Sequence, residues 1–545
     1  MSRNNKLLAT ILISACVLLG GFYDSNVAVL GVIVSAALVY FMLVEKSLMH
    51  FVIVPRSVND AVWLCPYVIF LLSVLTCFFA TDKMTNLFGI MRLGICLLWF
   101  YLYMQISYCE KVSVLVSIPF VGAVGTVLGI VSLITPFSAY FWQAGRLGGF
   151  VQYPNTWALV CGIGIMVMLS EKEMKTAFRI GMIIMLLSGM LLSGCRSILI
   201  LFILWTGIRI IKNKGSRKSA IIILLGVIVS AAMAYLCGGG DGLTQNIGRL
   251  FTIGKYNSTL IGRILYNLDA CKYLIKHPFG LGFMGYYYRQ GSFASGVYTT
   301  RFVHNDFLQV GLDYGILSGI LFTVFIIFQI VKGKQSMLQK EILLFVSVAS
   351  LFDFHMQYMA VVFIMVACMD VPPALSKCKK GTVNENIIFA SIIAIVCVYI
   401  AIPTTYTQIG KYDSALYFLP GYTEAMVMRL ATIDDVNEAN RLSEEIIAKN
   451  KYCVSAHNAL VYTKAMHGQI PEMIDEIECA ISLDPYNVTR YVAYSELIDA
   501  TLAQGTDEIE LLLKEKEDLA QTLKSMEGRT SALAYYIKDK PVFEY

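Results

Sequence analysis

A histidine and an arginine stand together in residues 301–309 of this 545-residue chain, between a polar segment and an apolar one. We expect His304 to open a helix, and a helix N-terminus disfavours the imidazolium. Nearby arginines act in the same direction. A neutral imidazole can accept a proton near neutral pH. The position therefore suggests a general base beside an anionic substrate, and the alternative is a structural histidine at a helix end.

Arginines at other apolar boundaries could supply the complementary charge. Arg196 follows the tight turn Ser193-Gly-Cys195 and opens an apolar run. Its guanidinium and the unpaired backbone N–H groups of a helix N-terminus predict an anion site, whereas the alternative is an interfacial arginine. Arg92 lies about 7 Å inside its run by helical rise and should line a polar cavity unless an acid pairs with it.

A glycine-rich loop and a second polar turn add further candidates. Arg146 opens the loop that ends in Asn155, and Asn155 can cap the next helix. Asp353 and His355 could orient His304 or share its work, and three tyrosines at 286–288 could stack on sugars or form an interfacial belt. The predicted catalytic residues are His304, Arg196 and Arg263. The predicted substrate-binding residues are Arg146, Arg92, Asn155, Arg289, Arg301, Asn305, Asp353, His355 and Tyr287.

No metal or cofactor is expected from the motifs. The sequence lacks a convincing pair of metal-binding carboxylates or a histidine cluster, and the glycines at 238–242 are not followed by the Lys-Ser/Thr of a phosphate loop. Negative charge that develops on a leaving group would therefore fall to arginines, whose guanidinium forks fit phosphate oxygens.

The composition indicates the class of fold that positions these residues. Hydrophobic residues make up 57% of the chain, charged residues 15%, and the mean hydropathy is +0.65. Apolar runs of membrane-spanning length predict an all-α polytopic bundle of about 12–13 spans. We retain the first run as a span, because no cleavage site of a signal peptide precedes the next one. The predicted spans are 7–23, 27–44, 61–80, 87–108, 113–135, 156–170, 180–194, 197–212, 219–238, 306–331, 341–352, 356–370 and 385–403.

Charge sets the domain boundary and the orientation. Residues 1–403 carry a balance of +15, and residues 404–545 carry −10. With a cytoplasmic N-terminus, 18 lysines and arginines fall on the cytoplasmic side and three in the short outer loops. This count favours a hairpin over one helix for 341–370. It also places the loop 239–305, with an amphipathic helix at 261–276, and the C-terminal domain outside the cytoplasm.

The acidic C-terminal segment shows an internal repeat. Tyr452 and Val454 recur as Tyr486 and Val488, each 34 residues later, which is the tetratricopeptide period. We therefore predict a small tetratricopeptide-like helical domain over 404–545 that binds a protein partner.

Ordered motifs over residues 140–370 resemble those of the O-antigen ligase/polymerase superfamily of bacterial membrane glycosyltransferases. They are Gly145-Arg146…Tyr153-Pro-Asn155, Ser193-Gly-Cys-Arg196-Ser, Gly262-Arg263…His277-Pro-Phe-Gly-Leu-Gly282, His304-Asn-Asp-Phe-Leu-Gln309…Gly315 and Leu351-Phe-Asp-Phe354. The C-terminal segment looks like an extension found in some members. The motif around Asp353-Phe-His355 departs from the simpler family pattern, so the resemblance assigns no role to His355.

The resemblance implies metal-independent, inverting transfer of a glycan from an undecaprenyl-diphosphate carrier to a glycan or lipid acceptor hydroxyl, at the outer face of the bacterial cytoplasmic membrane. By the same resemblance, Arg196 and Arg263 would hold the diphosphate with help from Arg146, and His304 would deprotonate or orient the acceptor. We favour a polymerase over a ligase, since no dedicated acceptor site is evident. No nucleic-acid partner is expected.

The rival from another class is a transporter or flippase of lipid-linked oligosaccharide or polysaccharide. Such a protein would carry ionisable residues near the membrane midplane and paired broken helices. The charged residues here gather instead at the predicted outer mouth. A receptor that scaffolds through its C-terminal domain would leave Arg92 and the arginine–histidine group without a purpose.

Overall fold

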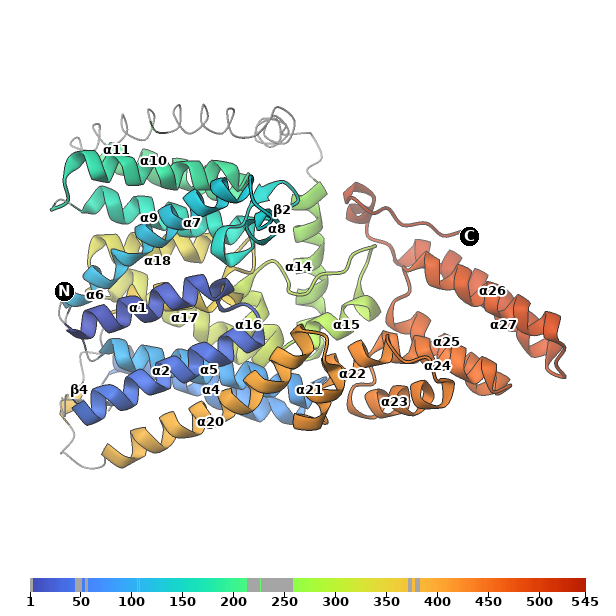
Figure 1. Ribbon diagram of the computed structural model, residues 1–545. Coiled ribbons are helices and arrows are strands. Elements are labelled where there is room, and N and C mark those ends of the chain that lie inside the picture. Colours follow the sequence, from blue (N-terminus) through green and yellow to red (C-terminus); the bar gives the residue numbers. More distant parts are fainter. Residues whose placement is uncertain are drawn as a thin grey trace.

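The computed structural model is a bundle of helices with a helical arm at one end (Figure 1). The N-terminus lies at the end of the bundle that faces away from the arm. The structure describes residues 3–44, 51–53, 57–104, 106, 108–171, 173–212, 226, 258–370, 375–377 and 383–545.

Apolar runs become helices because a helix satisfies its backbone polar groups within the segment. The longer bundle helices are α1 (Arg3–Val17), α2 (Asp24–Val44), α4 (Cys65–Leu75), α5 (Lys83–Met104), α6 (Tyr108–Leu115), α7 (Ser117–Ser132), α9 (Pro154–Ser170), α10 (Thr176–Leu192), α11 (Arg196–Lys212), α16 (Asp306–Tyr314), α17 (Ile316–Lys332), α18 (Met337–Ala349), α19 (Met359–Ala367) and α20 (Val383–Gln408). Short helices join them: η1 (Leu19–Gly21), α3 (Val58–Ala61), η2 (Val62–Leu64), η3 (Thr76–Phe78), α8 (Ser138–Phe141), η4 (Gly149–Val151) and η6 (His355–Gln357).

Within the described residues, five helical segments are long and apolar enough to cross a membrane: Asp24–Phe41, Val58–Phe78, Lys83–Met104, Lys111–Ser132 and Ile387–Gln408. Shorter apolar helices span Pro154–Ser170, Thr176–Leu192 and Ile316–Lys332. The all-α polytopic class is therefore confirmed, while the number of spans stays a prediction. The expected span 219–238 lies outside the described residues except for residue 226, as does 239–257 of the expected loop.

The helix expected at 306–331 is broken in two, which corrects the prediction. α16 ends at Tyr314, and α17 begins at Ile316. Gly315 between them has φ +94°, and a Cβ at this position would lie 2.9 Å from the carbonyl oxygen of Pro278. Glycine is needed here for both its backbone angle and the close approach of a second chain segment. The break leaves α16 as a short helix that carries the His304 region.

The segment 341–370 forms two helices, as the hairpin interpretation predicts. α18 and α19 are separated by a turn around Asp353. The backbone N–H of Lys334, before α18, donates to the side chain of Asp370, after α19, at 2.6 Å. The strand β4 (Leu375–Lys377) pairs with β1 (Phe51–Ile53). The start of α18 and the end of α19 therefore lie at one end of the bundle, and the Asp353 turn lies at the other.

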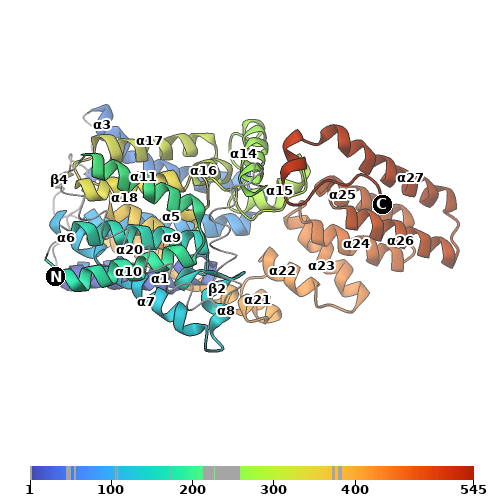
Figure 2. The same cartoon turned by 90° about the horizontal axis from the view of Figure 1, so that it is seen from above.

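Two loop helices, α14 (Ser258–Lys276) and α15 (Gly285–Phe293), lie between the bundle and the arm in both views (Figure 2). α14 matches the amphipathic helix expected at 261–276. The guanidinium of Arg289 on α15 lies 4.0 Å from the ring centroid of Tyr452 in the arm. The described part of the loop and the arm thus sit at the same end of the bundle.

The arm is a series of packed helices. They are α21 (Tyr412–Phe418), α22 (Thr423–Leu430), α23 (Val436–Lys449), α24 (Val454–Met466), α25 (Ile470–Leu483), α26 (Val488–Gln504), α27 (Ile509–Ser525), η7 (Met526–Arg529) and η8 (Ala532–Tyr536). Val454 and Val488 each open a helix, which fits the 34-residue spacing, but the tetratricopeptide identity stays a prediction. The compositional boundary at 403 falls inside α20, which continues through Pro403 to Gln408.

Candidate active site

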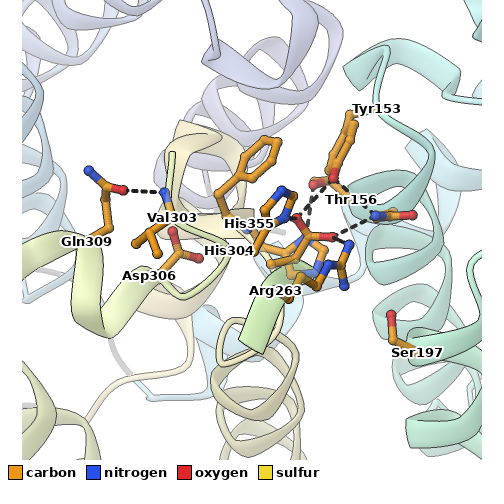
Figure 3. A network of polar contacts seen from close by, with 12 residues as sticks. Tyr153, Thr156, Ser197, Arg263, Val303, His304, Asp306, Gln309 and His355 are labelled. Carbon is orange, nitrogen blue, oxygen red and sulfur yellow. Dashed lines mark hydrogen bonds and ion pairs between the residues drawn. The ribbon is translucent and has the colours of Figure 1, made fainter. Parts of the chain in front are cut away.

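The buried carboxylate of Asp353 contacts four residues from three other segments of the chain. Figure 3 shows the network around Tyr153, Arg263 and His304. Oδ1 of Asp353 accepts from the Tyr153 hydroxyl at 2.9 Å and lies 3.0 Å from Nδ1 of His304. Its Oδ2 accepts from Nδ2 of Asn155 at 2.6 Å and from the Arg263 guanidinium at 3.1 Å. We call these five residues the Asp353 cluster. The structure thus brings together four sequence-predicted site residues (Asn155, Arg263, His304 and Asp353) that are distant in the chain.

The electrostatics of the cluster keep its centre negative. Burial raises the pKa of the Asp353 carboxyl, but the Arg263 guanidinium and the His304 hydrogen bond lower it, and the net pKa is well below its ordinary value. Asp353 is therefore a carboxylate throughout the physiological pH range. An ionised acceptor makes these hydrogen bonds stronger than neutral ones.

Two turns are fastened together to place His304 against Asp353. The side chain of Asn305 caps α16 by accepting from the Leu308 N–H at 3.1 Å. The Asp306 N–H donates to the Ser350 carbonyl at 2.9 Å, and its carboxylate accepts from the Met356 N–H at 2.8 Å. Asn305, predicted to bind substrate, therefore acts as a helix cap.

His304 precedes α16 instead of opening it, which corrects the argument from the helix N-terminus. Its ring faces a carboxylate through Nδ1 and packs near Phe354 and Tyr266, with centroid separations of 5.1 and 6.0 Å. When Nδ1 carries the proton that it shares with Asp353, Nε2 presents a lone pair. No described residue is hydrogen-bonded to Nε2. The side chain is 17% exposed, so the ring is accessible from outside the cluster.

Arg146 reaches the cluster from a two-residue β-hairpin. Strands β2 (Trp142–Gln143) and β3 (Arg146–Leu147) are joined by Ala144 and Gly145, both with positive φ, which is the geometry of a tight hairpin turn. Arg146 donates to the Asn155 side-chain oxygen and to the Ser193 carbonyl, each at 2.7 Å. Asn155 was expected to cap a helix. It lies inside α9 instead, because Pro154 already occupies the first turn, so its side chain is available to bridge Arg146 and Asp353.

Arg196 lies on the turn that Arg146 contacts. It is the half-buried first residue of α11. Cys195 before it is buried and lies within electrostatic range of both Asp353 and Arg146. The next residue, Ser197, points toward the same region but stands apart from the hydrogen-bonded group in Figure 3. The turn that carries Arg196 is therefore adjacent to the Asp353 cluster.

His355 lies behind the cluster. It is 1% exposed, and its Nδ1 is 3.0 Å from the Thr156 hydroxyl oxygen. Burial lowers the pKa of His355 to about 4, although the nearby Asp353 carboxylate opposes this shift. The imidazole is therefore neutral near neutral pH. Its buried position fits a support for the Asp353 turn better than the predicted contact with substrate.

Arg92 does not join the cluster. Its guanidinium pairs with Asp24 at 2.8 Å and also donates to the carbonyls of Phe22 and Gln357. A cavity of about 170 Å³ beside it is lined mainly by apolar side chains. These contacts fit structural pairing, not the predicted substrate contact, because an acid from another helix satisfies the charge.

The remaining candidates lie around the cluster or away from it. Arg289 contacts the hydroxyl of Tyr273 at 3.3 Å and lies over Tyr452, so it serves the junction with the arm. Tyr287 is 42% exposed on α15. Arg301 is exposed and lies 5.7 Å from the ring centroid of Phe22. Among the described residues, none of these three is hydrogen-bonded to Asp353.

Some residues of the site were not among the candidates. Tyr153 bonds Asp353, and its ring stacks on Phe354 at a centroid separation of 4.9 Å. Thr156 holds His355. Asn155, which lies between Tyr153 and Thr156 in the sequence, is indicated by its polar side chain. Tyr153 and Phe354 directly precede α9 and η6, and aromatic residues at these positions are a sequence signal for an aromatic surface beside the polar residues.

The fold and this group of residues define a multi-pass membrane protein with a buried, charged site at one end of its bundle. A family model described as O-antigen ligase matches residues 180–323. This match supports a relation to the O-antigen ligase superfamily and to ligase- or polymerase-type glycan transfer in surface polysaccharide biosynthesis. The matched region includes Arg196, Arg263 and His304, whereas Asp353 lies beyond it. Searches of curated proteins and of solved structures gave no match.

Proposed function

We propose that this protein is a metal-independent glycosyltransferase that polymerises or transfers a glycan from an undecaprenyl-diphosphate carrier onto an acceptor hydroxyl. The observation that carries the proposal is the convergence of Arg263 and His304 on the single carboxylate of Asp353, to which Arg146 is joined through Asn155. Such a group can balance negative charge on one side and accept a proton on the other.

The arginines are suited to the donor diphosphate. Arg263 uses one recorded N–H bond on Asp353, and its Nε is buried with no acceptor among the described residues. Arg146 contributes a second guanidinium, which donates to Asn155 beside that carboxylate, and the Arg196 turn adds positive potential from the N-terminus of α11. Preorganised charge of this kind stabilises a departing diphosphate, which carries several negative charges.

His304 is suited to the acceptor. The acceptor oxygen attacks the anomeric carbon, its proton passes to Nε2, and the bond from that carbon to the diphosphate breaks with the electron pair leaving on phosphate. Attack opposite the leaving group inverts the anomeric centre. Asp353 holds the imidazole through Nδ1 and stabilises the imidazolium that forms, as in other carboxylate–histidine pairs.

The location of the site supports transfer at the outer face of the cytoplasmic membrane. The Asp353 turn lies at the end of the bundle opposite Lys334 and the β1–β4 strand pair. In the sequence, 18 basic residues gather in the segments assigned to the cytoplasmic side. By the positive-inside rule the cluster, α14 and the arm then face the extracytoplasmic side, where a lipid-linked repeat unit would be presented.

Purified protein incubated with a carrier-linked repeat unit tests the proposal. Wild-type protein is expected to make longer chains, visible as a ladder on a gel, in the presence of EDTA. His304→Ala and Arg196→Ala proteins are expected to insert normally and to lose activity, for His304→Ala on the order of 10²–10⁴-fold. His467→Ala, at an exposed histidine of the arm, is the matched control. Wild-type rates in both site variants would remove the mechanism.

A further inference from the structure

The last helical segment of the arm, around η8, crosses back to the helix that carries Arg263. We call residues 531–537 the C-terminal strap. We infer that this strap is a positioning element, which holds α14 so that Arg263 and Tyr266 keep their places beside Asp353 and His304. The inference rests on the proposed function, because it assigns the arm a part in the same site.

The strap is docked by a hydrogen bond and by a small apolar core. The Ser531 N–H donates to the Ser295 carbonyl at 2.9 Å. Ala534 is 0% exposed and Ile537 is 4% exposed, and they bury Leu265 of α14 to 1%. These three side chains form a hydrophobic cluster of their own, separate from the core of the bundle. The strap is therefore packed on α14 and is not a loose tail.

The strap and the loop fit closely. A Cβ built on Gly296 would lie 2.6 Å from the Cβ of Ala534, so the backbone of the loop approaches the strap as only glycine allows. Asp269 of α14 accepts from the N–H of Ser295 at 2.9 Å and from its hydroxyl at 2.8 Å. Ser295, whose carbonyl accepts the hydrogen bond from the strap, is thus itself hydrogen-bonded to α14.

The contacts fall on the same two turns of α14 as the site residues. The strap packs against Leu265 and, at its edge, Gly262, whose Cβ position is 3.7 Å from Ile537. Arg263, between them, donates to Asp353 at 3.1 Å, and the ring of Tyr266 lies 6.0 Å from that of His304. Support on one side of these turns fixes the direction of the arginine on the other, and a misplacement of about 1 Å can cost on the order of 10²-fold in rate.

The strap also joins the arm to the loop. The Thr530 hydroxyl, just before it, lies 3.2 Å from that of Tyr486, and Arg289 of α15 stacks over Tyr452. The arm therefore holds both α14 and α15, and the arginine-bearing helix is supported from a domain outside the bundle.

Hydrogen–deuterium exchange tests the docking without any substrate. Ile537→Asp should raise exchange in peptides that cover α14, because a carboxylate cannot remain in the apolar contact with Leu265. Ile537→Val should behave like wild-type protein. Val542→Asp is the matched control, since Val542 is 52% exposed on the same tail. Unchanged exchange in α14 with Ile537→Asp would overturn the inference and leave the proposed function intact.

Transfer kinetics test the positioning role. Ile537→Asp is expected to lower kcat/KM for the lipid-linked donor about 10-fold or more, with Val542→Asp unchanged. In an Arg263→Ala background the same substitution should cause little further loss, because the strap would act through a side chain that is already gone. Additive losses would contradict positioning. A wild-type protein that transfers no glycan would instead refute the proposed function, and the positioning role with it.

Discussion

Arg92 pairs with Asp24 and Arg263 pairs with Asp353, at 2.8 and 3.1 Å, and all four side chains are largely buried. The surroundings of the two arginines differ. Arg92 uses Nε and both terminal nitrogens on Asp24 and two backbone carbonyls. Arg263 makes one recorded hydrogen bond, and its Nε is buried without an acceptor among the described residues.

This difference separates a structural ion pair from a candidate site. Buried polar groups are nearly always hydrogen-bonded, so an unmet donor in a charged cluster calls for an explanation. A ligand with phosphate oxygens would satisfy it at the Arg263 pair. The Arg92 pair has no comparable requirement. Residue type and burial, which are alike in the two pairs, do not distinguish them.

The strongest test makes the same arginine-to-methionine substitution in each of the two pairs. Arg263→Met should reduce glycan transfer about 10²–10³-fold, the usual cost of one preorganised donor. Its loss of stability should be smaller than that of Arg92→Met, because Asp353 keeps three other side-chain hydrogen bonds. Arg92→Met should destabilise the fold by roughly 3–5 kcal/mol, because Asp24 is left charged and buried. Its activity should follow the amount of folded protein.

Removing both partners sharpens the contrast. The double variant Arg92→Met/Asp24→Leu is expected to have a higher thermal midpoint than Arg92→Met, since no buried charge is left alone. Arg263→Met/Asp353→Leu should remain inactive whatever its stability. Equal behaviour of the two double variants in transfer assays would abolish the distinction between the pairs.

Acidification is expected to lower the folding stability of the protein through His355, which lies behind Asp353. Burial lowers the pKa of this imidazole to about 4, whereas an unfolded chain titrates near pH 6.5. Between these values the unfolded state binds the additional proton, so stability rises with pH and falls on acidification, by about 1.4 kcal/mol per pH unit at most. Thermal midpoints from pH 4.5 to 7.5 measure this slope.

His355→Gln should flatten that slope, since glutamine can still bond Thr156 but does not titrate. His467→Gln, at an exposed histidine, is the control and should retain it. Asp353 does not contribute in this window: its pKa is lowered, so its stabilisation is fully present above the unfolded value near 3.9 and is lost only at lower pH. A slope that persists in His355→Gln would assign the effect to another group.

Much of the helical order was predictable, because apolar length and basic residues report it directly. The sequence also indicated that Arg263, Asp353 and His304 would share one end of the bundle. It could not give the partner of Arg92, since Asp24 is 68 positions away on another helix. Nor could it place Asp353 at the centre of the cluster, because four separate segments must pack before its bonds exist.

The exact ends of helices were the other feature that the sequence did not predict. The end of α16 at Gly315 depends on the Pro278 carbonyl, which approaches from another segment. The helix start after His304 depends on the cap by Asn305, two positions from where the apolar pattern begins. Such boundaries follow from contacts between segments, which periodicity does not contain.

The smallest expected effect concerns Tyr153, whose hydroxyl donates to Asp353 at 2.9 Å while its ring stacks on Phe354. Tyr153→Phe removes one hydrogen bond from a carboxylate that keeps three other side-chain donors. A bond to a charged group contributes roughly 1.5–3 kcal/mol, and the retained ring preserves the packing. Part of that loss should appear in stability and part as a several-fold lower transfer rate, as Asp353 holds His304 less firmly.

Tyr103→Phe, at a buried tyrosine of α5 with no hydrogen-bond partner for its hydroxyl among the described residues, is the matched control. It should change neither stability nor rate appreciably, because it removes an unpaired hydroxyl. If Tyr153→Phe also left both unchanged, the Asp353 bonds would not act as a unit. The contrast with the fully satisfied Arg92 pair would then rest on Arg263 alone.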